Sequence, residues 1–292
     1  MIVPTSTMLT AASKAAFAVP AVNILDNLSL RAVVAAAEET EAPVIIQVSV
    51  KTVRSFGVRL VTEMFREVAT SSPAPLSLHL DHCPDVELIR EVVDAGWQSV
   101  LFDASDRDLN QAEEETAQVV AYAHAAGVDV ESEIENIIGV EDGVGSDEAI
   151  HSYGVGTLVE VANRTNADFI APQLGTAHGS YKSKPQLLPD RVREFLKLTD
   201  RPIVLHGGTG LSPQDFSEFI HAGVSKINVS TALKESYMRS AKAHLDVASA
   251  KNEWEPTRLF ADVLSGVRQE IVGFIHMFSA AGKADLVAEA VK

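Results

Sequence analysis

Eight apolar runs alternate along the chain with segments whose apolar residues recur at helical spacing. The runs cover residues 15–24, 44–49, 76–82, 99–104, 129–134, 168–174, 202–206 and 224–229, and the helical segments include 27–40, 85–95, 108–126, 188–199 and 212–222. A nearly unbroken apolar run such as residues 44–48 is typical of a parallel strand that is covered on both faces. Successive strand and helix units of this number close naturally into a barrel. The pattern therefore predicts an α/β fold, a single (β/α)8 barrel over residues 1–292 with extra helices near its C-terminus.

Composition and charge limit the function classes. The 292 residues are 46% hydrophobic and 22% charged, which is enough for one large core. The chain has 24 Lys and Arg against 40 Asp and Glu, a formal net charge of −16, whereas a nucleic-acid backbone is bound by clustered Lys and Arg. We therefore expect no nucleic-acid partner, although a locally positive pocket can still bind a small anion.

The sequence shows no sign of secretion or membrane insertion. No apolar run reaches the roughly 18 residues that span a bilayer, and residues 1–7 lack the basic start of a signal peptide. The single cysteine, Cys83, cannot form an internal disulfide. These features predict a cytoplasmic protein with no membrane partner.

Three histidines, His82, His178 and His206, each stand where an apolar run ends. Active-site groups of a (β/α)8 barrel gather at the C-terminal ends of its strands, so the three imidazoles should meet. One histidine at a strand end is more often a hydrogen-bonded structural residue, but three at the same face favour a metal site. The other histidines on helical or loop segments have no partner motif: His124, His151, His221, His244 and His276.

Carboxylates stand near these histidines. Asp81 neighbours His82, so a cation would keep it ionised and able to take a proton from a reacting hydroxyl; the alternative is an acceptor that orients a histidine. Asp103 and Glu133 lie at the ends of later runs, and each either binds a second or displaced metal or supports a ligand. His79 shares its strand face with Asp81 and is interpreted as a structural residue below the site.

Two turns after the last two predicted strands have the features of a phosphate site. Residues 207–210 are rich in glycine, and residues 228–231 open a helical segment. Loops at these positions commonly bind phosphate in such barrels, because free N–H groups and a helix N-terminus point at the anion.

With these motifs assembled, the chain resembles the class II, metal-dependent ketose-bisphosphate aldolases, which include fructose- and tagatose-bisphosphate aldolases. The resemblance covers nearly the whole length of the chain. The motifs that carry it occur in order: Ala18-Val19-Pro20-Ala21-Val22-Asn23, Pro43-Val44-Ile45-Ile46-Gln47-Val48-Ser49, Leu78-His79-Leu80-Asp81-His82, Gly175-Thr176-Ala177-His178-Gly179-Ser180-Tyr181-Lys182, Leu205-His206-Gly207-Gly208-Thr209-Gly210 and Lys226-Ile227-Asn228-Val229-Ser230-Thr231.

The resemblance implies a zinc-dependent aldolase. His82, His178 and His206 would hold the catalytic zinc, which other divalent ions could replace, and a monovalent cation is a further cofactor left open. Asp103 and Glu133 correspond to positions of alternative or second metal binding. In cleavage a divalent ion would stabilise the enediolate that remains when the carbon–carbon bond breaks, so no lysine nucleophile is needed.

The resemblance also implies roles for acid/base and substrate-binding residues. Asp81 would take the proton of the C4 hydroxyl, and Glu141, in the loop 139–143, would handle the proton at the enediolate carbon. The dihydroxyacetone phosphate half of the substrate would be bound at its phosphate and at its hydroxyketone end. The residues implied in substrate binding are Ser49, Gly179, Lys182, Gly207, Thr209, Asn228, Ser230, Thr231 and Arg258.

Departures from the family pattern concern the substrate more than the metal. Many members carry Tyr-Asp-Pro-Arg late in the chain, and its arginine can reach a neighbouring subunit's site. Here Arg258 stands one position later, and a one-residue shift turns a helical side chain by about 100°. The other changed positions are Val22, residues 24–27, Asp106, Glu135, Asn136 and Ala232.

The predicted reaction is reversible cleavage of a phosphorylated ketose, foremost a ketohexose 1,6-bisphosphate, to dihydroxyacetone phosphate and an aldehyde. A homodimer or homotetramer working in glycolytic carbohydrate metabolism is expected. The alternatives are a class II aldolase with a different aldehyde partner, a metal-dependent barrel hydrolase and a noncatalytic sugar-phosphate-binding protein. A hydrolase would not account for the two phosphate turns, and the intact Asp81 with its full histidine set argues against a noncatalytic protein.

Overall fold

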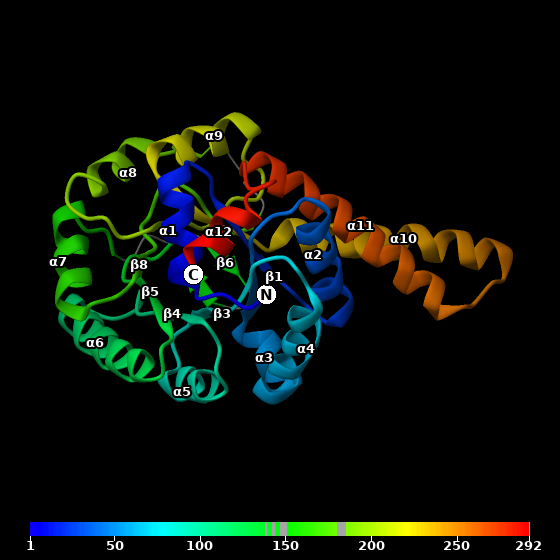
Figure 1. Cartoon of the computed structure of the whole chain (residues 1–292), viewed down its shortest axis with the longest axis horizontal. Helices are drawn as coiled ribbons and strands as arrows, with labels where there is room; N and C mark the ends of the chain where they lie inside the picture. The colour runs from blue at the N-terminus through cyan, green and yellow to red at the C-terminus, as the bar shows by residue number, and fades with distance from the viewer. Residues whose placement is uncertain (138, 142–143, 147–150, 180–184, 292) are drawn as a thin grey trace.

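The computed structural model describes residues 1–137, 139–141, 144–146, 151–179 and 185–291, with the backbone alone for residues 140–141 and 144–146. Parallel strands form a closed barrel in the order β1-β10-β9-β8-β5-β4-β3-β2, and helices surround it (Figure 1). The barrel strands are β1 (Val19–Asn23), β2 (Val44–Ser49), β3 (Leu76–Cys83), β4 (Ser99–Asp103), β5 (Asp129–Glu133), β8 (Phe169–Ile170), β9 (Ile203–Leu205) and β10 (Val224–Val229). The predicted (β/α)8 barrel is confirmed. A separate antiparallel hairpin, β6 (Gly139–Glu141) and β7 (Val144–Ser146), lies between β5 and β8 in the chain.

Two predicted strands are much longer than the observed ones, for different local reasons. The run at 15–24 begins with the end of a helix that stops at Ala16 in the left-handed region (φ 51°), so β1 starts only at Val19. The run at 168–174 pairs only at Phe169–Ile170, and Pro172 lacks the N–H that would continue the ladder. Beyond β8 the chain leaves the sheet, and this longer segment carries His178.

The helical segments predicted at 27–40, 85–95, 108–126, 188–199 and 212–222 begin within one residue of observed helices, and an aspartate caps the first turn of three of them. Asp26, Asp85 and Asp108 each accept backbone N–H groups of the helix that follows. None of the helices in the described part of the chain is long and apolar enough to cross a membrane. The helices are α1 (Thr5–Ala15), α2 (Asn27–Glu39), α3 (Val50–Phe56), α4 (Val58–Ser71), α5 (Val86–Asp94), α6 (Leu109–Ala125), α7 (Val155–Thr165), α8 (Pro189–Phe195), α9 (Pro213–Ala222), α10 (Thr231–Lys251), α11 (Pro256–Met277) and α12 (Ala284–Ala290).

Helix α1 covers the N-terminal end of the barrel. The hydroxyl of Thr5 lies 2.5 Å from that of Ser77 and 2.7 Å from that of Ser99, near the starts of β3 and β4. All three side chains are buried. Because this end is closed, the opposite end, where the strands finish, is left for a site.

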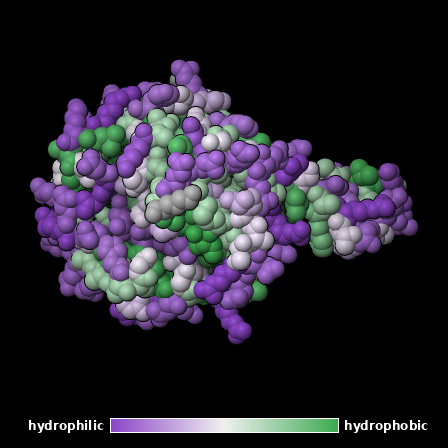
Figure 2. Space-filling model, in the orientation of Figure 1, coloured by the Kyte–Doolittle hydropathy of each residue, from purple (hydrophilic) through white to green (hydrophobic). Residues whose placement is uncertain are grey.

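Helices α10 and α11 form a hairpin that projects from the side of the barrel (Figure 1). The two helices approach closely, since a Cβ on Gly266 would lie 1.9 Å from the Ser240 hydroxyl. Along the hairpin Met238, Val247 and Trp254 are 67%, 53% and 65% exposed, and Figure 2 shows apolar residues on this projection. The hairpin therefore presents apolar surface that its own chain does not cover.

Candidate active site

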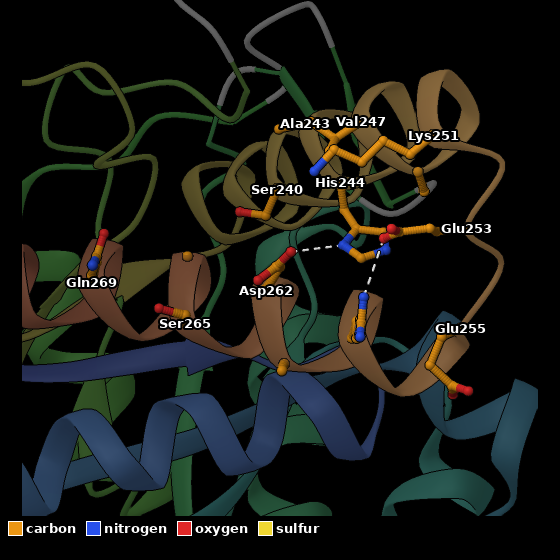
Figure 3. A pocket seen from close by; sticks show the side chains of 14 residues that line it. Ser240, Ala243, His244, Val247, Lys251, Glu253, Glu255, Asp262, Ser265 and Gln269 are labelled. Atoms are coloured by element: carbon orange, nitrogen blue, oxygen red, sulfur yellow. Dashed lines mark hydrogen bonds and ion pairs between the residues drawn. The ribbon is translucent and has the colours of Figure 1, made fainter.

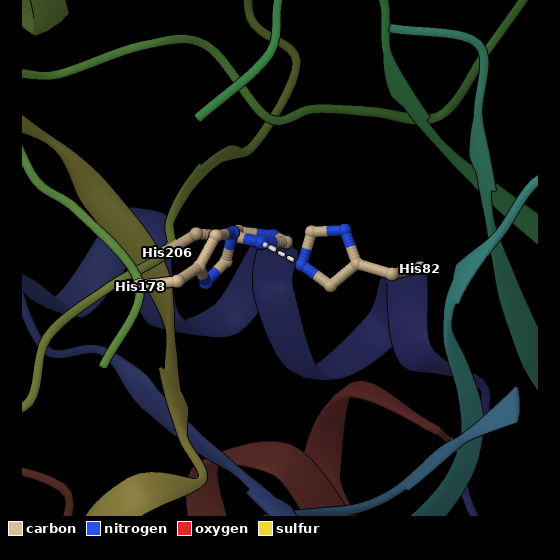
Figure 4. Close-up of side chains that lie close together, drawn as sticks. All are labelled: His82, His178 and His206. Atoms are coloured by element: carbon tan, nitrogen blue, oxygen red, sulfur yellow. Dashed lines mark hydrogen bonds between the residues drawn. The ribbon is translucent and has the colours of Figure 1, made fainter. Parts of the chain in front are cut away.

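The three histidines that were predicted at strand ends meet above the C-terminal end of the barrel. His82 lies near the end of β3, His206 directly follows β9, and His178 lies in the segment after β8. The His82 ring centroid is 4.9 Å from that of His178 and 4.7 Å from that of His206 (Figure 4). One nitrogen from each ring lies within 4.8 Å of the others. Imidazole groups at such spacing suit a transition-metal ion such as zinc.

Neighbouring carboxylates orient two of these rings. His82 Nδ1 lies 3.2 Å from Asp103 Oδ2, and His206 Nε2 lies 2.8 Å from Glu131 Oε1. The remaining nitrogens, His82 Nε2 and His206 Nδ1, face each other at 2.9 Å. A carboxylate that holds the outer N–H of an imidazole leaves its inner lone pair for a metal. The donor set therefore fits a divalent cation.

Buried negative charge surrounds the same point. His82, Asp103 and Glu133 offer ligand atoms within 4.8 Å of one another. Glu133 Oε2 is buried and has no hydrogen-bond partner within the described residues. Burial raises the pKa of Glu133 well above its ordinary value, and the charges of Asp103, Glu131 and Asp81 raise it further against the opposing effect of His82. A cation here would compensate these carboxylates.

The same buried carboxylates change the pKa of His82. Burial alone would lower the pKa of His82, but the carboxylates of Asp81, Glu133 and Asp103 raise it well above its ordinary value. Conversely, burial would raise the pKa of Asp103, but hydrogen bonds from His82 and Ser105 lower it to about 2. The site thus attracts positive charge, whether a proton on His82 or a metal ion.

Asp81 is held between two asparagines at this centre. It is buried, and its carboxylate accepts hydrogen bonds from Asn23 Nδ2 at 2.8 Å and from Asn228 Nδ2 at 3.3 Å. Asn23 in turn accepts a bond from Gln47 Nε2 at 2.5 Å. Asp81 Oδ1 lies 4.0 Å from His82 Nε2. Neutral amides fix this carboxylate without neutralising it, which suits a proton acceptor.

An ion pair inside the barrel supports the site from below, and the sequence reasoning did not assign it a role. Lys226 Nζ donates to Glu131 Oε2 at 2.7 Å, and both side chains are 0% exposed. His79 lies beside this pair: its Nδ1 is 2.8 Å from Ser99 Oγ and its Nε2 is 3.8 Å from Glu131. Burial, then the charge of Lys226, lowers the pKa of His79 well below its ordinary value. This neutral, buried position agrees with a structural role for His79. The sequence signal for the pair was Lys226, a charged residue inside the otherwise uncharged strand β10.

We expect Lys226→Met to lower the free energy of unfolding by about 3–5 kcal/mol, because it leaves the buried Glu131 carboxylate without its partner. Urea denaturation measures this change. Lys242→Met is the matched control: its pair with Asp246 measures 2.6 Å, close to the 2.7 Å of the Lys226 pair, but its side chains are 76% and 65% exposed, so its loss should cost less than about 1 kcal/mol. Equal effects of the two substitutions would show that the Lys226 pair does not support the barrel.

Several residues predicted to bind substrate lie beside the histidines. Asn228 Oδ1 and Ser230 Oγ are buried and lack a hydrogen-bond partner within the described residues. Ser230 precedes Thr231, the first residue of α10, without capping that helix through its side chain. Gly179 and Gly207 have positive φ angles of 78° and 69°. Free polar atoms beside a helix N-terminus suit an anionic group. Ser49, by contrast, caps α3 by accepting from Thr52 N at 3.4 Å, and Thr209 lies in the turn after β9.

Of the remaining predicted residues, Arg258 is not brought into this cluster within the chain. Arg258 lies at the start of α11, at the far end of the projecting hairpin, away from its own barrel centre (Figure 1). It is 68% exposed and pairs with Glu253 at 3.2 Å. It lines a cavity of about 650 Å³, in which His244 Nδ1 lies 2.7 Å from Asp262 (Figure 3). The side chain of Glu141 and all of Lys182 lie outside the described residues.

Comparison with known proteins is consistent across sequence and structure. The family model described as fructose-bisphosphate aldolase class-II matches residues 3–283. The fructose-bisphosphate aldolase of Geobacillus stearothermophilus is 34% identical over 282 residues, 95% of this chain and 96% of that protein. A probable fructose-bisphosphate aldolase of Bacillus subtilis is 34% identical over 284 residues, 95% of this chain and 97% of its own length.

Solved structures of aldolases are similar to this chain as well. A putative fructose-1,6-biphosphate aldolase from Coccidioides immitis has a TM-score of 0.87 at 26% identity, covering 96% of this chain and 98% of that one. The YdjI aldolase from Escherichia coli K12 has a TM-score of 0.82 at 25% identity, covering 97% of this chain and 100% of that one. Both likenesses extend over the barrel and the hairpin together.

Proposed function

Because this chain belongs to the class II fructose-bisphosphate aldolase family and is therefore a carbon–carbon lyase, we propose that its substrate is a ketohexose 1,6-bisphosphate. Cleavage would give dihydroxyacetone phosphate and an aldehyde, reversibly. The observation that carries this proposal is the meeting of His82, His178 and His206 next to the buried carboxylate of Asp81. A screen of phosphorylated ketoses for release of dihydroxyacetone phosphate tests it.

We propose that His82, His178 and His206 hold a zinc ion, with Asp103 and Glu133 offering an alternative or second metal position. The imidazoles and the Glu133 oxygen that has no hydrogen-bond partner among the described residues support this assignment. A bound divalent ion would supply a Lewis acid that polarises the ketone and stabilises the charge left by bond cleavage. We also propose that other divalent ions can replace zinc, and we keep a monovalent cation open as a further cofactor. The proposed location of the protein is the cytoplasm.

In this proposal Asp81 takes the proton of the C4 hydroxyl. Its carboxylate is fixed by Asn23 and Asn228, which orient it without adding a positive charge. Glu141 handles the proton at the carbon that becomes nucleophilic. Its backbone belongs to β6, which begins at Gly139 beside the main chain of His178, and this closeness supports the assignment.

We assign the phosphate of the dihydroxyacetone phosphate half to the turns after β8, β9 and β10. Asn228 would hold the hydroxyketone end through the amide oxygen that is otherwise unpaired, and Ser230 would bind phosphate through its unpaired hydroxyl. Ser49 and Lys182 complete the proposed set. The residues assigned to the phosphate are Gly179, Gly207, Thr209, Ser230 and Thr231.

We further propose that the protein is a homo-oligomer in which the α10–α11 hairpin contacts a second copy. The exposed apolar side chains of Met238, Val247 and Trp254 support this arrangement, because two helices alone seldom leave so much apolar surface in water. Arg258, at the end of the hairpin, would then bind the distal phosphate in the other copy's site. A homodimer and a homotetramer both satisfy this geometry.

Arg258→Ala should lower the preference for fructose and tagatose 1,6-bisphosphates over fructose 1-phosphate by about 10- to 100-fold. Hydrogen bonds to charged groups contribute roughly 1.5–3 kcal/mol. Cleavage efficiencies of the three sugars in wild type and variant measure the change. Arg239→Ala, on the same hairpin and 60% exposed, is the control and should keep the preference. Selectivity unchanged in Arg258→Ala would exclude this arginine from the distal phosphate.

A further inference from the structure

A buried carboxylate follows β5 and belongs to none of the roles above. Glu135 is 0% exposed, and it stands at a position where the chain departs from its family's pattern. Its Oε1 accepts hydrogen bonds from the backbone N–H of Tyr153 at 2.7 Å and from Arg191 Nη2 at 2.9 Å. Its Oε2 accepts from the backbone N–H of Gln173 at 3.0 Å. One side chain therefore ties together three separate segments of the chain.

Arg191, in the first turns of α8, completes the arrangement. Its guanidinium is 14% exposed, and it donates to the carbonyl oxygens of Gln173 at 2.5 Å and of Tyr153 at 2.6 Å. Gln173 and Tyr153 are thus each held at their N–H by Glu135 and at their C=O by Arg191. The planar fork of arginine and the two oxygens of a carboxylate make this geometry specific to the pair.

The clamp formed by Glu135 and Arg191 lies next to the segment that carries His178. Gln173 precedes His178 by five residues, and its side chain accepts from the N–H of Gly175 at 2.6 Å. Gly139, four residues after Glu135, lies so close to His178 that a Cβ there would be 2.7 Å from its carbonyl oxygen. The main chain of His178 is therefore bordered by segments that the clamp fixes.

His178 needs such a support more than the other two histidines do. His82 belongs to β3, and His206 directly follows β9, so the hydrogen-bonded ladder of the barrel places both. His178 lies eight residues beyond the end of the short β8, at Ile170. Between Ile170 and the β-bridge at Ala177 the chain lies outside the barrel ladder, so side chains such as Glu135 and Arg191 help to position it.

We propose that the Glu135–Arg191 clamp positions His178 against His82 and His206, and so sets the affinity of the site for its metal ion. The inference rests on the proposed metal site and adds a positioning role for two residues outside it. An apolar pair of the same volume would leave the N–H and C=O groups of the half-buried Gln173 and Tyr153 without these partners, and each such group is costly. Burying the Glu135–Arg191 ion pair costs desolvation energy. We infer that the pair is retained because it fixes the geometry of these backbone groups.

The test measures Zn²⁺ affinity by competition with a chromophoric chelator. The proteins are wild type, Glu135→Gln, His178→Ala and the double variant, with Glu113→Gln as control because its bidentate pair with Arg164 lies on the outer surface. Glu135→Gln keeps the shape but turns an N–H donor toward a backbone N–H. It should weaken Zn²⁺ binding by about 10-fold, in the range for outer supports of a metal site. In the His178→Ala background, Glu135→Gln should change the Zn²⁺ affinity by less than about 2-fold, because the imidazole that the clamp positions is absent. The control Glu113→Gln should bind Zn²⁺ as the wild type does.

Two results would overturn the inference: wild-type affinity in Glu135→Gln, or the same loss with and without His178. The second would mean that the clamp acts through general stability. Arg191→Lys keeps the charge but loses the fork, and it should show the same dependence on His178; it serves as the milder variant if Glu135→Gln does not fold. A wild-type protein that binds no Zn²⁺ would contradict the proposed function itself, which separates the two failures.

Discussion

Removal of the divalent ion should abolish aldol cleavage, by about 1000-fold or more, while the barrel stays folded. The Lewis acid contributes several kcal/mol of charge stabilisation, and nothing else in the proposed site replaces it. The fold should survive because the proposed ligands stand at or beyond the C-terminal ends of the strands, whereas the core is formed by apolar residues and the Lys226–Glu131 pair below. The measurements are release of dihydroxyacetone phosphate and far-ultraviolet circular dichroism after chelation, with recovery on adding one equivalent of zinc.

Full activity in protein verified to be free of metal would contradict the zinc assignment. Such activity would require a lysine that forms a Schiff base with the ketone. Lys226 is a poor candidate for that role, since it is fully buried and paired with Glu131. Trapping with borohydride would distinguish the two aldolase chemistries directly.

Asp81→Asn should lower turnover by about 100- to 10,000-fold with little change in bound metal. A positioned proton-transfer group contributes that range, and the asparagine keeps the shape between Asn23 and Asn228. Steady-state kinetics and metal content are measured on the same preparation. A parallel fall in rate and metal content would instead assign Asp81 to the support of His82, which lies 4.0 Å away.

The barrel and the meeting of its histidines were predictable because both follow from local pattern. Continuous apolar runs define parallel strands, and the barrel's geometry then brings every strand end to one face. His82 and His206 needed only this argument. His178 reaches the site only because the chain after Ile170 turns back over the barrel. The sequence did not indicate this turn, because the apolar run at 168–174 predicted a strand longer than the observed β8.

The supports of the site were not predictable because they are pairings between residues distant in the chain. Glu131 and Lys226 are separated by 95 residues, and Glu135 and Arg191 by 56. A charged residue in an apolar strand signals that a partner exists, but not which residue it is. The position of Arg258 at the end of a projecting hairpin likewise depends on how α10 and α11 meet at Gly266.

The most direct test of the account is cleavage of fructose and tagatose 1,6-bisphosphates by the zinc-loaded protein, compared with His206→Ala. His206 lies at the centre of the site, bonded to Glu131 and facing His82. We expect dihydroxyacetone phosphate and an aldehyde in equal amounts from at least one of these sugars, and loss of cleavage together with bound zinc in the variant. Failure of the zinc-loaded wild type to cleave any 1-phosphorylated ketose, or release of inorganic phosphate in place of an aldehyde, would contradict the account.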